Sequence, residues 1–351
     1  MKEDIKNYLV KNTDSARFAL RKITNLKGLT NLTLFVVDNK MRLVGTLTDG
    51  DIRRGLLNDL EISESVKLFM NNNFKFAIEG KIDNKLLKTY KQSGASYIPI
   101  INEQKSLKSI IDLNKTKAVL PISALIMAGG KGMRLRPLTE NDPKPMLKVG
   151  DKPIIEHNID RLISFGINEI FISVRYLKEK IIKYFGDGSK KGIVIKYIHE
   201  DEPLGTIGAL SKISEIKNKD LLVINSDLLS NIDFEEFYNS FKNNNYEMSV
   251  ASIPYNVSVP YAVLKLNKDI INEFVEKPKY TYYSNAGIYL IKKELKKLIP
   301  KNSFYNSTDL MNELIFSKKR LGHFPIIGYW LDIGRHDDYI QAQKDIKKIN
   351  F

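Results

Sequence analysis

The chain has 351 residues, with 55 Lys and Arg against 41 Asp and Glu, a formal net charge of +14, and no cysteine. This length accommodates two domains with separate cores. The missing cysteines exclude disulfides, thiolate catalysis and cysteine-ligated zinc. No apolar run approaches the roughly 18 residues of a membrane span, and Met1–Asp4 lead into charged sequence. We therefore expect a cytoplasmic protein with no membrane partner.

The positive charge does not by itself indicate a nucleic-acid partner. Lysine is abundant along the whole chain, and no basic stripe interleaved with aromatic residues stands out. Part of the surplus can instead serve a site for a small polyanion. We expect no nucleic acid to bind.

The first third contains an imperfect internal repeat. Residues 34–38 and 98–102 are apolar strand patterns 64 positions apart, and helical patterns at 15–23 and 84–92 precede them. A polar turn and a second strand, 43–47, follow the first copy. Repeats of this kind determine architecture, so we expect two similar modules.

The motif Gly45-x-x-Thr48-x-x-Asp51-Ile-Arg-Arg ends the first copy with a helix start that is acidic in its first turn. It resembles the CBS domain, which occurs in tandem pairs and often binds adenine nucleotides. The resemblance implies that Thr48 contacts a phosphate and Asp51 the ribose hydroxyls. Asp112 and Lys115 stand at the equivalent positions of the second copy, so at most one nucleotide is expected. In the alternative, Asp51 only starts a helix and the pair serves dimerisation or regulation.

The remainder of the chain alternates strand and helix signals, which predicts an α/β fold with a mixed, mainly parallel sheet. We assign residues 1–118 to the tandem CBS pair (α+β), 119–122 to a linker and 123–351 to a second domain. Its predicted strands are 124–128, 170–174, 193–198, 221–226, 248–253 and 261–266, with more around 284–291 and 324–330. A helical pattern over 152–166 has Glu156 and His157 outside its apolar face, so we expect both to be solvated.

The strand pattern ending at Ala128 runs directly into Gly129-Gly130-Lys131-Gly132. Glycine-rich loops let backbone N–H groups approach phosphates closely. The dinucleotide fingerprint and the P-loop both require residues that are missing here. Three cations follow the loop: Arg134, Arg136 and Lys144. An anionic ligand is therefore expected, the alternative being a basic surface loop.

The pattern G-G-x-G-x-R-x-x-P from Gly129, followed by Pro143-Lys144-Pro145, resembles the signature of sugar-1-phosphate nucleotidyltransferases. The resemblance covers about residues 123–340. It implies a Rossmann-like domain that binds Mg²⁺, an NTP and a sugar 1-phosphate. It also implies catalytic roles for Arg134 and Lys144, and nucleotide binding by Ala128, Gly129, Gly130, Gly132, Gly205 and Thr206. In the alternative for the Gly205 loop, Thr206 caps a helix.

Two apolar stretches each end in a carboxylate, Asp227 and Asp332. One such aspartate is more often a turn or capping residue. In the resembled family two aspartates at these motif positions hold Mg²⁺, which prefers oxygen ligands. The resemblance therefore implies that both are catalytic metal ligands.

The sugar side is implied by two further motifs. Glu276-Lys277-Pro278 matches a family pattern in which the acid binds sugar hydroxyls and the lysine the sugar's phosphate. Asn285 and Gly287 match the N-x-G motif. A surface ion pair is the alternative for Glu276 and Lys277. Ala262 stands where the family usually has glycine, so the identity of the sugar is left open.

The order of the parts also carries information. A CBS pair ahead of a transferase resembles the guanylyltransferases of bacterial legionaminic acid synthesis, which implies GTP, glucosamine 1-phosphate and cell-surface glycan synthesis. Alternatives are mannose or glucose 1-phosphate with GTP, UTP, dTTP or CTP. A catalytically silent nucleotide sensor is a further alternative, although such a copy should have lost Lys144 or a metal aspartate. We expect a homo-oligomer.

Overall fold

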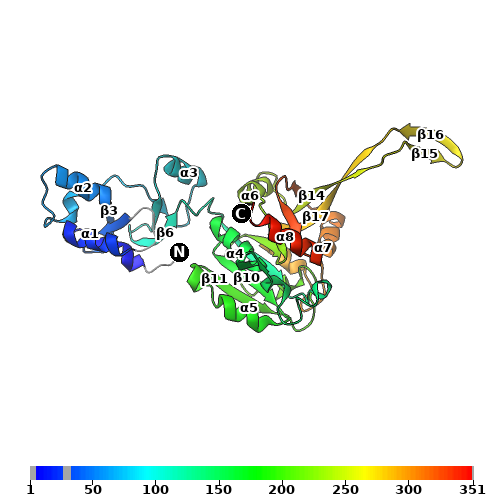
Figure 1. The fold of residues 1–351 in the computed structure, drawn as a ribbon, viewed down its shortest axis with the longest axis horizontal. Coiled ribbons are helices and arrows are strands. Elements are labelled where there is room, and N and C mark those ends of the chain that lie inside the picture. Colours follow the sequence, from blue (N-terminus) through cyan, green and yellow to red (C-terminus); the bar gives the residue numbers. More distant parts are fainter. Residues whose placement is uncertain (1–4, 27–32, 350–351) are drawn as a thin grey trace. The chain divides into compact units, whose positions relative to one another are not determined.

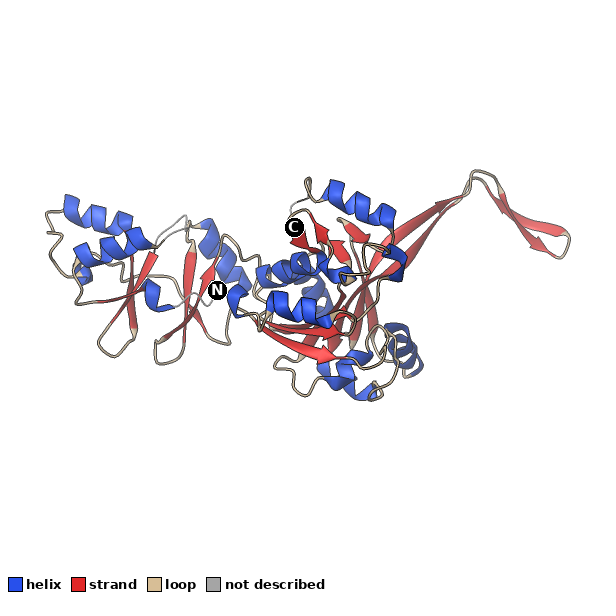
Figure 2. Cartoon of the chain, turned by 60° about the horizontal axis from the view of Figure 1, so that its bottom comes forward, coloured by secondary structure: helices blue, strands red, loops and turns tan. Residues whose placement is uncertain are grey.

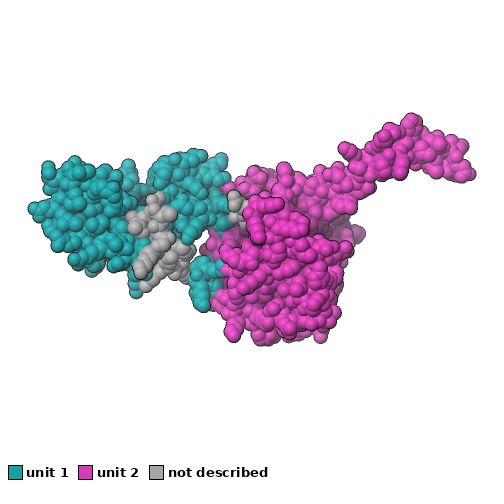
Figure 3. Space-filling view, viewed as in Figure 1, with its two compact units in different colours: residues 1–119, 164–166, 188–193 teal, residues 120–163, 167–187, 194–351 magenta. Residues whose placement is uncertain are grey.

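The computed structural model describes residues 5–26 and 33–349. Met1–Asp4, which the sequence analysis used, lie outside the described residues. The chain divides into two compact units (Figure 3). The first comprises residues 1–119, 164–166 and 188–193, and the second residues 120–163, 167–187 and 194–351.

The first unit contains two similar three-stranded modules. In each sheet the first strand pairs in parallel with the second, and the second pairs antiparallel with the third. The first module contains β1 (Leu9–Lys11), α1 (Ala16–Asn25), β2 (Thr33–Val37), β3 (Leu43–Thr48) and α2 (Asp49–Leu57). The second contains β4 (Ala77–Ile78), α3 (Asn84–Gln92), β5 (Tyr97–Ile101) and β6 (Leu107–Asp112).

The internal repeat extends to the irregularities of the ladders. The register shifts between Val36 and Val37 in the first module and between Ile100 and Ile101 in the second, which are equivalent positions at an offset of 64 residues. A cluster that includes Tyr8, Phe35 and Ile101 packs residues of the two modules together. The predicted repeat is therefore present as two packed structural modules.

The second unit is built on a seven-stranded sheet of order β11-β10-β7-β12-β17-β14-β18 (Figures 1 and 2). Among its described strands only the β17 pairings are antiparallel, so the sheet is mixed and mainly parallel, as predicted. Its strands are β7 (Ile122–Ala128), β10 (Glu169–Val174), β11 (Val194–His199), β12 (Asp220–Asn225), β14 (Met248–Ser258), β17 (Lys279–Lys292) and β18 (Leu321–Pro325). Strands β7, β10 and β12 are almost entirely buried, which explains their continuous apolar sequences.

Within residues 120–349, five α-helices accompany this sheet: α4 (Ile154–Ser164), α5 (Lys178–Phe185), α6 (Phe234–Asn243), α7 (Ser307–Phe316) and α8 (His336–Asp345). The expected solvation of Glu156 on α4 is wrong. Glu156 is 8% exposed, and Tyr184 of α5 donates a hydrogen bond of 2.6 Å to its carboxylate. His157 is half-buried, with Nε2 2.9 Å from the Val149 carbonyl oxygen. The hydrophobic periodicity of α4 does not reveal which of its polar side chains have partners on other elements.

Strands β14 and β17 are longer than the sequence predicts. They leave the sheet as a two-stranded ribbon, and the hairpin of β15 (Val263–Asn267) and β16 (Ile270–Val275) stands at its far end (Figures 1 and 2). Burial along β14 stops at Ser252, since the residues from Tyr255 to Ser258 are exposed. We call residues 254–283 the arm.

Smaller strand pairs complete the second unit: β8 (Lys148–Val149) with β9 (Lys152–Pro153), and β13 (Leu228–Ser230) with β19 (Trp330–Asp332). Among the helices of the described residues, none combines the length and hydrophobicity needed to span a bilayer.

The central strand β7 gives a direct test of the core. Leu125 is fully buried among side chains of the sheet, so Leu125→Ala should lower the free energy of unfolding by about 2–5 kcal/mol. Phe316→Ala is the control, because Phe316 is 90% exposed and its truncation should change stability by less than about 0.5 kcal/mol. Urea unfolding followed by circular dichroism measures both. Equal effects would contradict this core.

Candidate active site

Four parallel strands end at the same edge of the large sheet, and the residue or loop after each one contributes to a cavity. Gly129 follows β7, Arg175 follows β10, Glu200 follows β11, and Ser226-Asp227 follow β12. Open α/β sheets bind ligands at the carboxyl ends of their strands. Sequence reasoning missed Arg175 and Glu200, although each stands directly after a predicted strand, which was the available signal.

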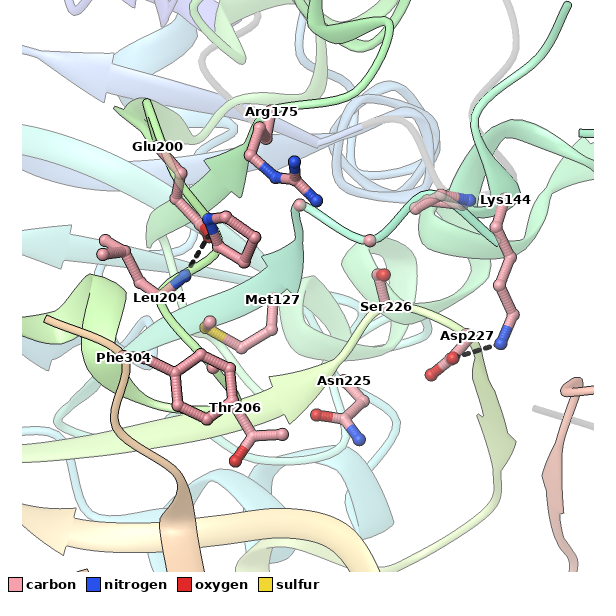
Figure 4. Close-up of a pocket in the computed structure, with 15 residues that line it drawn as sticks. Met127, Lys144, Arg175, Glu200, Leu204, Thr206, Asn225, Ser226, Asp227 and Phe304 are labelled. Carbon is pink, nitrogen blue, oxygen red and sulfur yellow. Dashed lines mark hydrogen bonds and ion pairs between the residues drawn. The ribbon is translucent and has the colours of Figure 1, made fainter. Parts of the chain in front are cut away.

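The cavity has a volume of about 250 Å³ (Figure 4). Its walls combine a glycine loop, two cations, two carboxylates and a few apolar side chains. They are formed by Met127, Gly129, Gly130, Lys144, Pro145, Arg175, Glu200, Pro203, Leu204, Gly205, Thr206, Asn225, Ser226, Asp227 and Phe304. Ala128, Gly132, Arg134 and Asp332 do not line it.

The glycine loop is held by close contacts that only glycine permits. A Cβ on Gly129 would come within 2.8 Å of Glu200 Oε1, and a Cβ on Gly132 within 2.9 Å of Lys144 Cβ. Gly132 also has a φ of +64°, and its carbonyl accepts a 2.8 Å hydrogen bond from the Thr139 hydroxyl. The loop is thus packed between buried Glu200 and the backbone that carries Lys144.

Lys144 joins the two predicted metal aspartates. Its ammonium group forms an ion pair with Asp227 and lies 3.8 Å from Asp332 Oδ1. The Lys144 side chain is 12% exposed, so these charges interact more strongly than at an open surface. Arg134 is close to Asp332. An added Cβ on Gly334, two residues after Asp332, would lie 3.3 Å from the Arg134 guanidinium, and the charge of Arg134 acts to lower the pKa of Asp332.

The environment raises the pKa of Asp332. Burial is the main cause, followed by the negative charge of Asp227; Lys144 and Arg134 oppose the shift. Asp332 Oδ1 is buried and accepts no hydrogen bond from the described residues. Two neighbouring carboxylates, one with such an oxygen, are suitable ligands for Mg²⁺. In the described part of the chain no cluster of three or more His, Cys, Asp or Glu suits a metal, so further ligands would come from phosphate oxygens and water.

The loop at Gly205 and Thr206 is fixed by the start of α7. Gly205 has a φ of +76°, and a Cβ there would lie 2.6 Å from the Tyr305 carbonyl oxygen. The Thr206 hydroxyl accepts a 2.8 Å hydrogen bond from the Ser307 backbone N–H. Thr206 therefore bonds to the first turn of a helix a hundred residues later, not to the helical segment that follows it.

The predicted sugar-side residues are separated in the structure. Gly287 has a φ of +73°, and an added Cβ would lie 2.7 Å from Asn225 Nδ2 at the cavity wall. Asn285 accepts a 2.9 Å hydrogen bond from the Gly287 N–H. Glu276 and Lys277 are exposed, follow β16 at the far end of the ribbon and do not line the cavity.

The first unit has its own cavity, of about 1,170 Å³, between residues of the two modules. Thr48 and Asp51 line it, together with Arg54, Phe74 and Lys75. Asp51 Oδ2 accepts hydrogen bonds from the Thr48 N–H and hydroxyl, at 2.8 and 2.7 Å, and Oδ1 pairs with Arg54 at 2.5 Å. The cavity therefore combines cations, a ring and a capped helix start.

The second unit is similar in sequence to known proteins. The family described as nucleotidyl transferase matches residues 123–349. The chain is 34% identical over 229 residues to a mannose-1-phosphate guanyltransferase of Yarrowia lipolytica, covering 63% of each protein. It is 36% identical over 237 residues to the bifunctional protein GlmU of Methanocaldococcus jannaschii, covering 65% of this chain and 55% of that protein. These matches span less than two thirds of either relative.

A solved structure shares the fold of the second unit. It was provisionally assigned as a glucose-1-phosphate thymidylyltransferase from Bacillus anthracis and was determined in complex with a sucrose. The TM-score is 0.53 at 26% identity, and the match covers 66% of this chain and 97% of that one.

The Asp332 environment leads to a stability prediction. A carboxyl whose pKa is raised by folding destabilises the native state when it ionises, so the effect is present above its unfolded pKa. Asp332→Asn removes that charge and should raise the metal-free melting temperature at neutral pH by about 2 °C. It should also abolish stabilisation by MgCl₂. Thermal unfolding with EDTA or MgCl₂ tests both.

Asp142→Asn provides the matched control, since Asp142 is an exposed carboxylate paired with Lys180. This variant should keep the wild-type response to MgCl₂. A metal response that survives in Asp332→Asn would exclude Asp332 as a ligand.

Proposed function

Since the chain belongs to the nucleotidyl transferase family, we propose that it joins a sugar 1-phosphate to a nucleoside triphosphate and releases pyrophosphate. The observation that carries this proposal is the position of Lys144. It lies between Asp227 and Asp332, at the edge of a cavity lined by Gly129 and Gly130. That arrangement can bind a triphosphate together with the positive charges that offset the negative charge of its phosphates.

The reaction is attack by a phosphate oxygen of the sugar 1-phosphate on the α-phosphorus. A new P–O bond forms there, the bond to the β-phosphate breaks, and pyrophosphate leaves with the electron pair. A phosphate monoester has a second pKa of about 6 and is already largely dianionic at neutral pH. It needs no general base. The site must instead align two polyanions and offset their repulsion.

Residues of the cavity and of the adjoining charge cluster perform these tasks. The backbone of Gly129 and Gly130 approaches the triphosphate, and Lys144 contacts its phosphates. Arg134, beside Asp332, adds positive charge near the leaving group. Asp227 and Asp332 would hold Mg²⁺, which when bound neutralises phosphate charge. The nucleobase lies against Gly205 and Thr206.

GTP is the favoured donor. Two carboxylates line the cavity, and Glu200 is the one on the side of Leu204 and Gly205. Guanine presents neighbouring N–H donors on its Watson–Crick edge, and a carboxylate accepts two such bonds. The Glu200 oxygens already accept from Ser173 and from Leu204 N–H, at 3.2 Å for the latter, so their orientation is set. The name of the Yarrowia relative also supports GTP.

The acceptor is a hexose 1-phosphate. Glucosamine 1-phosphate comes first because the domain order resembles the guanylyltransferases of legionaminic acid synthesis. Mannose 1-phosphate comes second, supported by the name of the guanyltransferase relative. Glu276 and Lys277 are proposed to bind the sugar and its phosphate, with Asn285 and Gly287 on the sugar side. A panel of each NTP with each sugar 1-phosphate, followed by pyrophosphate release, tests the whole proposal; no release from any pair would refute it.

Substitutions at the charge cluster test the mechanism. Lys144→Ala and Asp227→Asn should each lower kcat/KM by about 10²-fold or more, a loss of roughly 3 kcal/mol, because each removes charge stabilisation. Lys180→Ala is a matched control, since Lys180 forms an exposed ion pair with Asp142, and it should stay within about twofold. Near-wild-type rates in either cluster variant would overturn the assignment.

We also propose that the first unit is a CBS pair that binds one adenine nucleotide. Thr48 would contact its phosphate and Asp51 its ribose hydroxyls. Arg54 and Lys75 line the same cavity and supply positive charge, and the Phe74 ring offers a stacking surface. The second module lacks a helix equivalent to α2 after β6 in its described residues, which supports a single site.

Calorimetry of the full chain with AMP tests this site. Asp51→Asn should weaken AMP binding by about tenfold or more, the effect of losing a hydrogen bond to a charged group. Asp112→Asn, in the other module at the position equivalent to Thr48, should leave it unchanged. Absence of heat with AMP in the wild-type chain would refute the proposal.

A further inference from the structure

The arm exposes an unusual amount of apolar surface. Tyr255 on β14 and Tyr282 on β17 are directly paired across the ribbon and are both exposed. Tyr283 faces the opposite side, because successive strand residues alternate. The exposed large side chains of the arm are Tyr255, Val257, Tyr261, Leu264, Leu266, Ile270, Ile271, Phe274, Tyr280, Tyr282 and Tyr283.

Such a ribbon is poorly stabilised by its own contacts. An isolated two-stranded hairpin is at best marginally stable in water, and contiguous exposed apolar patches mark interaction surfaces. Strands β15 and β16 pair with each other and form a separate two-stranded sheet. We therefore expect the arm to form one side of a protein–protein interface.

The second observation is the position of Glu276 and Lys277, whose sugar-side role rests on the function proposed above. Asn285 lies at the root of the arm near the cavity, and Lys277 is eight residues away along the chain. The six residues of β17 that separate Lys279 from Asn285 span about 20 Å at strand spacing. Unbroken pairing from Ser252↔Asn285 to Ser258↔Lys279 keeps this ribbon extended. Lys277 is thus held away from the cavity of its own chain.

We propose that two copies of the chain exchange arms, and that Lys277 and Glu276 of one copy complete the acceptor site of the other. Two arms packed antiparallel about a two-fold axis near Thr281 bring Lys277 of one copy beside Asn285 of the second. Both sites are completed at once, since a two-fold interface is reciprocal.

The surface around the arm's root can receive the hairpin. Phe304 lines the cavity and is 63% exposed, and Ile327 is 96% exposed. Ile327 follows Ile326, whose N–H donates a 2.7 Å hydrogen bond to the Ser252 carbonyl where the arm leaves the sheet. Ile327 is thus near the root of the arm, and Phe304 is at the cavity that the second arm would complete.

The area available is that of a stable dimer. Aromatic side chains bury about 150–250 Å² each, so the exposed fractions of the arm's six aromatic residues offer on the order of 700 Å². The aliphatic residues add to this. A standard interface buries about 800 Å² per partner, which the two arms together with their receiving surfaces would reach.

Complementation between two inactive variants tests whether the lysine acts in trans. Lys277→Ala and Asp227→Asn are co-expressed with different tags and purified in tandem, so that each dimer contains one of each. Exchange predicts that one site carries both changes while the other is intact, which restores about half of the wild-type activity. Activity no higher than that of the separate variants would overturn the proposal. Thermal unfolding of both variants checks their folding.

A second test does not depend on activity, so it separates this inference from the proposed function. The chain has no cysteine, and Tyr282→Cys introduces a single one near the proposed axis. A bismaleimide should join two copies of this variant into a covalent dimer. Phe316→Cys, at an exposed site on α7, should stay monomeric on denaturing gels. Equal cross-linking of both variants, or none of Tyr282→Cys, would refute arm exchange even if the wild type released pyrophosphate.

If no pair of substrates gives pyrophosphate while Tyr282→Cys cross-links selectively, the proposed function fails and the arm contact stands. If wild type is active and complementation fails, the function stands and Lys277 acts within its own chain.

Discussion

The site depends on one cluster of charges, in which the largely buried Lys144 lies between Asp227 and Asp332. The two carboxylates come from segments about a hundred residues apart and repel each other; Lys144 offsets both, and Arg134 adds positive charge beside Asp332. Burial and this repulsion raise the pKa of Asp332, and its Oδ1 accepts no hydrogen bond within the described chain. An oxygen that lies 3.8 Å from Lys144 but accepts no hydrogen bond would be stabilised further by a bound cation, a common relation between function and stability.

The rest of the second unit positions that cluster. Buried strands β7 and β12 are neighbours in the sheet, so the loops after them meet at one edge. The glycine loop after β7 packs against Lys144 and against buried Glu200 through contacts too close for any side chain. The Gly205 loop is fixed by the start of α7. The cavity walls are thereby held by close packing and by hydrogen bonds between distant segments, which favours a site formed before its ligand binds.

The two units contain different kinds of cavity. The cavity of the second unit is lined by backbone, two cations and two carboxylates, whereas the larger cavity of the first lies between two repeated modules. Arm exchange would add a third element, since each acceptor site would then require a second copy. A dimer of this kind makes association a condition of catalysis, and any contact that strengthens association would raise activity at low concentration.

The sequence by itself determined the mixed α/β class and the repeated modules, because buried strands need continuous apolar residues and because a repeat of 64 residues preserves even the ladder irregularities. It also identified Gly129–Gly132, Lys144, Asp227 and Asp332 as candidates, since their residue types are distinctive after apolar stretches. Tertiary structure alone decided that Arg175 and Glu200 enter the cavity, that Glu156 is buried, and that Lys277 lies far from Asn285. The physical reason is range: propensity and spacing are local, whereas sheet order, helix packing and ribbon length depend on partners distant in the chain.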